Sequence, residues 1–286
     1  DNQKAISYHE KALVIAEELG DKKGKGDQLD NLGNAYLNLG DSRKAISYYE
    51  KALAIAEEPG AKKGIVSISV KVGAPYINLG DYRKAISYFE RALALAEEIG
   101  DKQGKGHCLG SLGIAYGSLG DYRKAISYHE KALAIAEEMG DKHLIGTVVG
   151  NLGNVYRDLG DFRKAISFYE KAIDIEKEIG IPYGIPEGNL ADAFLSLDRD
   201  DEALAIYTKH NHSIRLGRYH LKKKDYTKAK DQFNRNREEN EKTRNAAFIL
   251  PEWIGLGLSH EGLKEYEEAY RWYKKAINFM EDQRAA

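Results

Sequence analysis

Residues that could carry out chemistry are few and scattered in this chain of 286 residues. The single cysteine, Cys108, follows His107, but adjacent residues of a helix point apart and no group is evident that would orient the histidine as a base. His210 and His212 are two positions apart, which places them on different helix faces and leaves a metal without a third ligand. We therefore predict a small buried thiol at Cys108, and no catalytic residue, metal site or cofactor.

One glycine- and lysine-rich segment has the composition of a phosphate-binding loop. The residues GDKKGKGD at 20–27 do not fit G-x-x-x-x-G-K-[ST], because both the glycine spacing and the final residue differ. A simpler interpretation is that these glycines allow close packing at the start of a helix.

The chain is built from repeated segments, and these must position the polar residues. LGNAYLNLG at 32–40, VGAPYINLG at 72–80, LGIAYGSLG at 112–120 and LGNVYRDLG at 152–160 each begin 40 residues after the previous copy. Each repeat contains two amphipathic segments with apolar residues three and four apart, which predicts two helices, A and B. Asp21 and Asp41 are predicted N-caps, and Gly40 and Gly60 are predicted helix ends.

This pattern resembles the tetratricopeptide repeat family, whose helix A carries a large residue, Leu-Gly and Tyr, and whose helix B carries Ala, an aromatic residue and Ala. The 40-residue period and the NLGN phrase are similar to LGN/Pins adaptors and to arrays that precede CHAT proteases. His9 and His129 occupy the aromatic position and are expected to be core residues. The first full repeat matches at Leu29, Leu32, Gly33, Tyr36, Ala45, Tyr49 and Ala52.

The resemblance implies an all-α fold: a right-handed superhelical solenoid of antiparallel helix pairs, with the A helices lining a concave groove. We expect residues 1–20 to be helix B of a truncated repeat. Residues 21–180 form four regular units and residues 181–286 three divergent units of one continuous solenoid. Because the chain begins in the middle of a repeat, we interpret it as a fragment of a longer protein.

Repeat registration predicts which side chains face the groove. Asparagine is a mediocre helix former, yet it recurs at groove positions where packing does not demand it. Its amide can hydrogen-bond the backbone of an extended peptide, as the resemblance to LGN-like proteins implies; simple copying of the repeat would give the same pattern. The predicted peptide-binding residues are Asn31, Asn34, Asn38, Lys71, Asn78, Asn151, Asn154, Arg157, Asn189, Arg215, Arg218 and Lys222.

The second repeat departs from the others at Pro75, where Ala35, Ala115 and Val155 stand in the other copies. Proline inside a helix costs roughly 3 kcal/mol and frees one carbonyl, here that of Lys71. One hypothesis is a kink that divides the groove into two parts; the alternative is drift tolerated by a long array.

The composition limits which classes of partner are expected. The chain has 43 basic and 45 acidic residues and a net charge of −2, so nothing attracts it globally to nucleic acid or to an acidic membrane. A single cysteine and the lack of an apolar run of about 20 residues favour a cytoplasmic protein. We expect a scaffold or adaptor that binds a protein or peptide. The alternatives are a sensor arm of a larger protein, such as a CHAT protease, and weak nucleic-acid binding through the basic residues at 215–230. The oligomeric state stays open.

Overall fold

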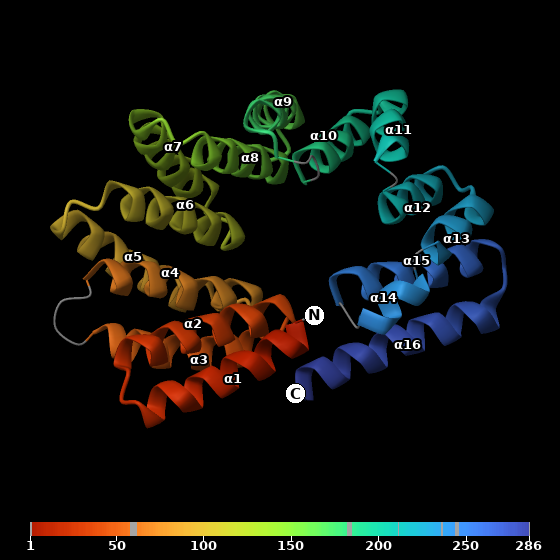
Figure 1. Ribbon diagram of the computed structural model, residues 1–286. Helices are drawn as coiled ribbons and strands as arrows, with labels where there is room; N and C mark the ends of the chain where they lie inside the picture. The colour runs from red at the N-terminus through yellow and green to blue at the C-terminus, as the bar shows by residue number, and fades with distance from the viewer. Residues whose placement is uncertain are drawn as a thin grey trace. The chain divides into compact units, whose positions relative to one another are not determined.

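The computed structural model describes residues 2–57, 62–181, 185–210, 212–235, 237–243 and 246–285. Every regular element in these ranges is an α-helix, and the helices follow one another in antiparallel pairs (Figure 1). They form two compact units, Asp1–Tyr183 (unit 1) and Gly184–Ala286 (unit 2). The predicted all-α fold of helix pairs is confirmed.

The helices alternate between the two predicted types, with one addition. The A helices are α2 (Lys22–Asn38), α4 (Lys62–Asn78), α6 (Lys102–Ser118), α8 (Lys142–Asp158), α10 (Ile185–Ser196), α12 (Ser213–Lys222) and α15 (Ala246–Gly262). The B helices are α1 (Asn2–Glu18), α3 (Ser42–Ala56), α5 (Tyr82–Glu98), α7 (Tyr122–Met139), α9 (Phe162–Ile179), α11 (Asp200–Lys209), α13 (Tyr226–Asn234) and α16 (Tyr266–Ala285). A short helix, α14 (Arg237–Thr243), was not predicted.

Local sequence sets the helix ends in unit 1. The Asp21 carboxylate accepts a hydrogen bond from the amide of Gly24 at 2.9 Å, and Asp41 accepts one from the amide of Lys44 at 3.0 Å. Both therefore satisfy a first-turn donor, as expected of N-caps. Gly40 ends its turn with φ +80°, a conformation that only glycine adopts without strain. The predicted helix end at Gly60 lies outside the described residues.

Each regular pair in unit 1 packs a large ring against a glycine. A Cβ on Gly33 would lie 2.5 Å from the Tyr49 ring, so the close approach of α2 and α3 requires glycine. Further along the pair, Tyr36 stacks on Tyr48 with ring centroids 5.3 Å apart. His129, at 1% exposure, takes the place of Tyr49 in the third repeat, as predicted for a core histidine.

Pro75 does not shorten its helix. Helix α4 spans 17 residues without interruption, the length of α2, α6 and α8. The proline ring is buried, like the side chains at the equivalent positions of the other three repeats. Pro75 thus faces the packed interior of the repeat. The division of the groove by a kink stays a hypothesis.

Unit 2 keeps the architecture with less regular chemistry. The turn from an A helix to a B helix again uses a positive φ, but non-glycine residues adopt it: Asp198 (φ 55°), Lys224 (φ 60°) and Lys264 (φ 64°). Helix α14 docks on α15 through a hydrogen bond from the Trp253 indole to Glu241 of 2.8 Å. The turns between A and B helices in unit 2 thus persist without the glycines that mark them in unit 1.

Candidate functional site

The A-helix face of unit 1 carries most of the predicted binding residues. We define it by the positions equivalent to 27, 30, 31, 34, 37 and 38 in α2. Asn38 and Asn78 are exposed, and Asn31 and Asn151 are half-buried. Arg157 is half-buried and pairs with its neighbour Asp158 at 2.9 Å. The residues predicted from repeat registration thus lie partly open to solvent on one set of helices.

Two of the asparagines have an internal task that the sequence interpretation missed. The Tyr49 hydroxyl donates to Asn34 Oδ1 at 2.9 Å, and the Tyr169 hydroxyl donates to Asn154 Oδ1 at the same distance. Tyr49 is 1% exposed, so its hydroxyl needs a partner inside the protein. The expectation that packing does not demand an amide here is therefore wrong for Asn34 and Asn154.

In the other two regular repeats, the B helix has no tyrosine at this position and the A helix has no asparagine. Where helix B carries Phe89, which has no hydroxyl, helix A carries Ala74. Where it carries His129, helix A carries Ile114. The sequence contained this signal: the identity of the residue 15 positions downstream predicts whether the A-helix position is polar.

Lys71 connects the first two repeats across the A-helix face. Its Nζ lies 2.5 Å from Asp30 Oδ2, and both side chains are partly buried. The pair therefore joins α2 to α4 and places one positive and one negative group in the middle of the face. Burial, with a smaller contribution from Asp30, raises the pKa of Tyr49 to about 12.

A pocket of about 340 Å³ lies beside Lys71, between α4 and α6. Helix α4 contributes the partly apolar floor and two lysines, and the first turns of α6 contribute the opposite wall. Four of the lining positions belong to the A-helix face, so the pocket is a recess in the surface predicted to bind a peptide. The lining residues are Lys63, Val66, Ser67, Val70, Lys71, Asp101, Gln103, Gly104 and His107.

The pocket coincides with the most divergent helix A of unit 1. Ser69 is fully buried where the other repeats place Leu29, Leu109 and Val149, and its hydroxyl has no hydrogen-bond partner among the described residues. Sequence reasoning singled out this repeat through Pro75 and overlooked Ser69. The substitution was visible in the alignment of the repeats as a loss of side-chain volume at a core position.

In unit 2, most of the predicted basic binding residues are engaged internally. Arg215 donates to Asp192 at 3.2 Å and to Asn189 at 3.1 Å. Lys222 donates to the carbonyl of Leu195 at 2.9 Å and lies 3.3 Å from Asp198. Arg218 is exposed. Intramolecular pairing at Arg215 and Lys222 weakens the case for an anion-binding surface at 215–230, because a ligand would have to displace existing partners.

The histidines of unit 2 form structural contacts. His210 Nε2 lies 2.9 Å from Glu187 Oε2, and the rings of His210 and His212 are 5.8 Å apart. Burial, with smaller contributions from Arg215 and His210, lowers the pKa of His212. Within the described residues no group of three or more His, Cys, Asp or Glu side chains is arranged to hold a metal ion.

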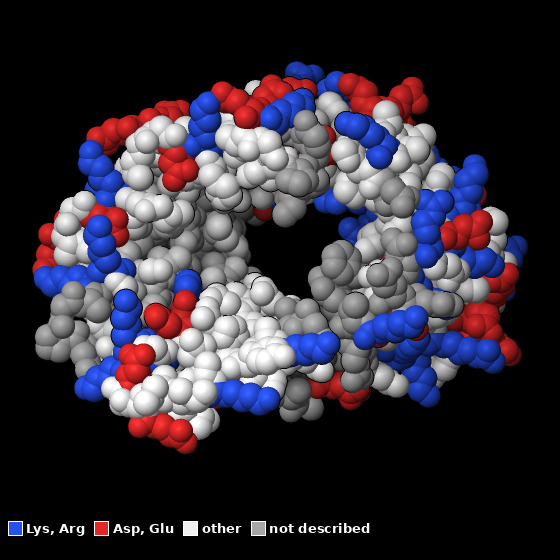
Figure 2. Space-filling view, in the orientation of Figure 1, with Lys and Arg blue, Asp and Glu red and all other residues white. Residues whose placement is uncertain are grey.

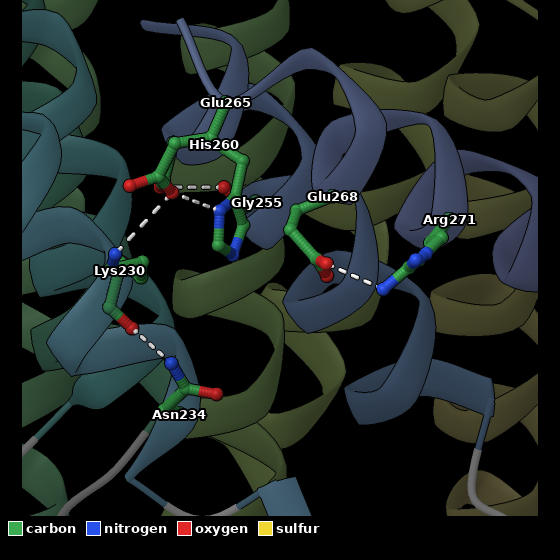
Figure 3. Close-up of polar contacts among 8 residues, drawn as sticks. Lys230, Asn234, Gly255, His260, Glu265, Glu268 and Arg271 are labelled. Carbon is green, nitrogen blue, oxygen red and sulfur yellow. Dashed lines mark hydrogen bonds and ion pairs between the residues drawn. The ribbon is translucent and has the colours of Figure 1, made fainter. Parts of the chain in front are cut away.

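His260 replaces the helix A tyrosine in the last unit. Its Nδ1 lies 2.5 Å from Glu265 Oε2, and Lys230 of α13 lies 3.5 Å from the same carboxylate (Figure 3). The hydrogen bond with His260 is the largest cause that lowers the pKa of Glu265. A polar contact thus takes the place of the stacked aromatic pair and ties α13 to the turn between α15 and α16.

The surface of unit 1 carries both signs of charge, as the nearly neutral composition predicts. In the view of Figure 2, Lys and Arg side chains are interspersed with Asp and Glu along the outer edge of unit 1. Cys108 is fully buried, and burial raises the pKa of its thiol to about 12, as predicted for an unreactive core cysteine. A search of the described helices finds none long and apolar enough to cross a membrane.

The family model for the tetratricopeptide repeat matches residues 1–58, 65–138, 119–178 and 144–210, and a second model of that repeat matches residues 253–279. The chain belongs to the tetratricopeptide repeat family. Stacked repeats of this kind create extended concave surfaces that are suited to binding. No characterised protein sequence matches the chain in a search of curated proteins.

Solved structures show the same fold at low sequence identity. The apo form of the quorum sensor NprR from B. thuringiensis aligns with a TM-score of 0.71 at 18% identity, over 97% of this chain and 83% of NprR. A Rap protein complexed with competence and sporulation factor aligns with a TM-score of 0.69 at 16% identity, over 91% of this chain and 75% of Rap. A STAND protein with a tetratricopeptide repeat sensor from Pyrococcus horikoshii aligns at 0.60 and 19% identity, over 95% of this chain and 44% of that protein.

Proposed function

We propose that this tetratricopeptide repeat protein binds an extended segment of a partner protein on the A-helix face of unit 1, as a scaffold or adaptor without catalytic activity of its own. The observation that supports the proposal is the pocket between α4 and α6. It forms a hollow in the A-helix face at the second repeat, whose sequence departs most from those of the others. An extended peptide anchored there places successive side chains along neighbouring A helices.

The pocket lining favours a side chain with an apolar stem and a hydrogen-bond acceptor at its end. Val66 and Val70 offer apolar contact, and Lys63 brings positive charge to the rim. The charge of Lys71 is already paired with Asp30, and Asp101 adds a negative charge to the opposite wall. Gln103 and His107, both exposed, add hydrogen-bonding groups on the opposite wall. A glutamine side chain has this combination of stem and head, and its neutral amide avoids repulsion by Asp101.

The neighbouring asparagines then act on the peptide backbone. Asn31, Asn38 and Asn78 are accessible on the same face. Asn34 contributes differently, since the Tyr49 hydroxyl holds its Oδ1 and thereby fixes the orientation of the amide. An amide that is oriented before binding loses less conformational entropy when it meets a ligand.

The test is selection of peptides from a displayed library with the parent chain, followed by affinity measurement with a variant that fills the pocket. Ser67→Tyr places a large ring at an exposed pocket position and is expected to weaken selected peptides at least about tenfold by excluding their anchor side chain. Ala134→Tyr, at an exposed position of α7 outside the pocket, is the matched control and should leave the affinity unchanged.

Two results would contradict the proposal. One is a library that yields no enriched peptide although the chain is folded by circular dichroism. The other is a set of peptides that bind the Ser67→Tyr variant as tightly as the parent. Peptides that instead lose affinity with substitutions in unit 2 would also place the site elsewhere.

A sensor function is the second candidate, and two of the structural relatives support it. NprR is a quorum sensor, and the Pyrococcus horikoshii protein carries a tetratricopeptide repeat sensor. In that case the same face would receive the signal and pass it to another domain. Peptide-dependent protection of the α4 and α6 amides in hydrogen exchange, extending to α8 and α9, distinguishes a relayed signal from simple docking.

A further inference from the structure

Each regular repeat of unit 1 exposes the same two kinds of side chain where helix A turns into helix B. The leucine of each turn is 45–47% exposed; these are Leu39, Leu79, Leu119 and Leu159. An exposed arginine follows four residues later, in the first turn of the B helix; these are Arg43, Arg83, Arg123 and Arg163. We call these leucines and arginines together the A–B edge.

The arginines have no partner inside the protein. None of them makes a hydrogen bond, an ion pair or a ring contact within the described residues. The lysine next to each arginine differs, because it pairs with the N-cap aspartate and lies over an aromatic ring. Lys44, for example, lies 3.3 Å from Asp41 and 5.0 Å from the centroid of the Tyr36 ring. The lysine thus stabilises the turn, while the guanidinium group beside it stays open to solvent.

The arginines also oppose the electrostatics of their own helices. The N-terminus of an α-helix carries a partial positive charge, which favours acidic side chains in the first turn and disfavours basic ones. In unit 2 the equivalent residues are acidic or neutral: Asp201 in α11, Thr227 in α13 and Glu267 in α16. A B helix therefore forms without arginine at this position, so folding does not account for the arginines of unit 1.

Contacts between neighbouring repeats bring the turns together along one edge. The Tyr88 hydroxyl of α5 donates to Glu50 of α3 at 3.0 Å, so the first halves of these two B helices lie side by side. In the next step, the Tyr116 hydroxyl of α6 donates to Glu90 of α5 at 3.4 Å. Successive A–B turns therefore lie on the same edge of unit 1.

We propose that the A–B edge of unit 1 binds an acidic segment of a partner protein that carries apolar side chains between its carboxylates. A guanidinium group pairs with a carboxylate through two parallel hydrogen bonds, and the leucine beside it offers apolar contact. Arginine and aromatic residues are enriched in protein interfaces, and Tyr82, Tyr122 and Phe162 directly precede three of the arginines. The edge shares no residue with the pocket between α4 and α6 and does not depend on the peptide-binding proposal.

The net charge of −2 conceals this positive edge, because the last turns of the B helices are acidic. Those carboxylates are already paired: Glu98 lies 2.5 Å from Lys62, and Glu138 lies 2.6 Å from Lys102. The unpaired charge of the regular repeats is therefore that of the arginines. The leucines favour a protein segment over a nucleic acid, since a phosphate backbone has no aliphatic group to place on them.

The first experiment measures the binding of two labelled synthetic peptides of equal charge by fluorescence anisotropy, in about 0.15 M salt. The peptide ELGELGELGELG carries carboxylates and leucines, and ESGESGESGESG has serine in place of each leucine. We expect saturable binding of the first peptide that weakens as salt is added, and at least about tenfold weaker binding of the second. Leu79→Ser together with Leu119→Ser in the chain should abolish the difference between the two peptides.

Charge reversal tests the arginines without disturbing the fold. Arg83→Glu together with Arg123→Glu should weaken binding of the leucine-containing peptide at least about tenfold. The Tm should stay equal or rise, because acidic side chains suit a helix N-terminus. The matched control is Lys23→Glu with Lys171→Glu, which makes the same change of charge at exposed positions outside the A–B edge and should leave binding unchanged. Ser67→Tyr, which fills the pocket, should also leave it unchanged.

The proposal is overturned if the leucine-containing peptide shows no saturable binding, or if charge reversal at Arg83 and Arg123 leaves its affinity unchanged. Equal affinity for the two peptides would also overturn it, because the leucines would then contribute nothing. Vesicles of phosphatidylserine and phosphatidylcholine and a single-stranded oligonucleotide are tested in parallel. Binding of either one that is tighter than that of the peptide and is lost on charge reversal would assign the edge to that class of ligand, against the proposal.

Discussion

The Tyr49 hydroxyl donates a hydrogen bond to Asn34 Oδ1 at 2.9 Å, across the two helices of the first full repeat. The same bond joins Tyr169 to Asn154. Because the hydroxyl of Tyr49 is buried, the A-helix asparagine stabilises the fold in addition to any role in binding.

Asn34→Ala should lower the free energy of unfolding by about 1–2 kcal/mol, because it leaves the buried Tyr49 hydroxyl without an acceptor. Adding Tyr49→Phe should recover part of that loss, since the pair Ala74 and Phe89 occurs naturally in the second repeat. Urea unfolding of both single variants and the double variant gives the coupling energy. Strictly additive effects would show that the bond contributes nothing.

His129 should make the protein sensitive to acid. Burial lowers the pKa of His129 from 6.5 to about 4. Between these pH values the histidine is protonated in the unfolded chain and neutral in the folded chain. Stability should fall by up to about 3 kcal/mol as the pH drops from 6.5 to 4. His129→Phe, which copies Phe89 of the second repeat, should flatten the dependence of Tm on pH over this range. His143→Gln, at an exposed histidine, is the control and should leave the slope unchanged.

Pro75→Val should stabilise the protein. The equivalent position of the fourth repeat holds the buried Val155, so valine fits, and the substitution restores a backbone donor inside α4. We expect the free energy of unfolding to rise by about 1–3 kcal/mol. A lower midpoint in urea would mean that the second repeat is built around the proline ring. Unchanged stability with altered peptide affinity would favour the proposed effect on the groove.

Cys108 should resist modification while the chain is folded. Its thiol is fully buried and its pKa rises from 9.0 to about 12, so the thiolate is scarce at pH 8. Labelling by a disulfide reagent should be slow in buffer and fast in urea. The control is Ser67→Cys in a Cys108→Ala background, whose thiol at an exposed position should react fast in the folded protein.

The same shift has a consequence for alkaline stability. Between pH 9 and 12 the unfolded chain loses the thiol proton and the folded chain keeps it, so stability falls as the pH rises through this window. Cys108→Ala should remove that component of the decline. Equal labelling rates with and without urea would show that Cys108 is accessible in the folded protein.

Local chemistry alone determined the helices, their order and most of their ends. Asp21 and Asp41 cap helices, and Gly40 turns with a positive φ, because these effects involve atoms within one helical turn. The apolar spacing within each half-repeat fixed which side of a helix is buried. For this reason the A and B helices could be predicted, and among the helices that the structure describes only the short α14 was not.

Only the tertiary structure decided which groups meet across helices. The bond between Tyr49 and Asn34 spans 15 residues, and the pairing of Lys71 with Asp30 spans 41. Such contacts depend on how neighbouring helices approach, and that distance is set by small residues such as Gly33 that carry no polar chemistry themselves. The pocket between α4 and α6 arises in the same way. The sequence specifies the residues of each helix, while the distance of the adjacent helix decides which of their polar groups pair inside the fold and which stay open to solvent.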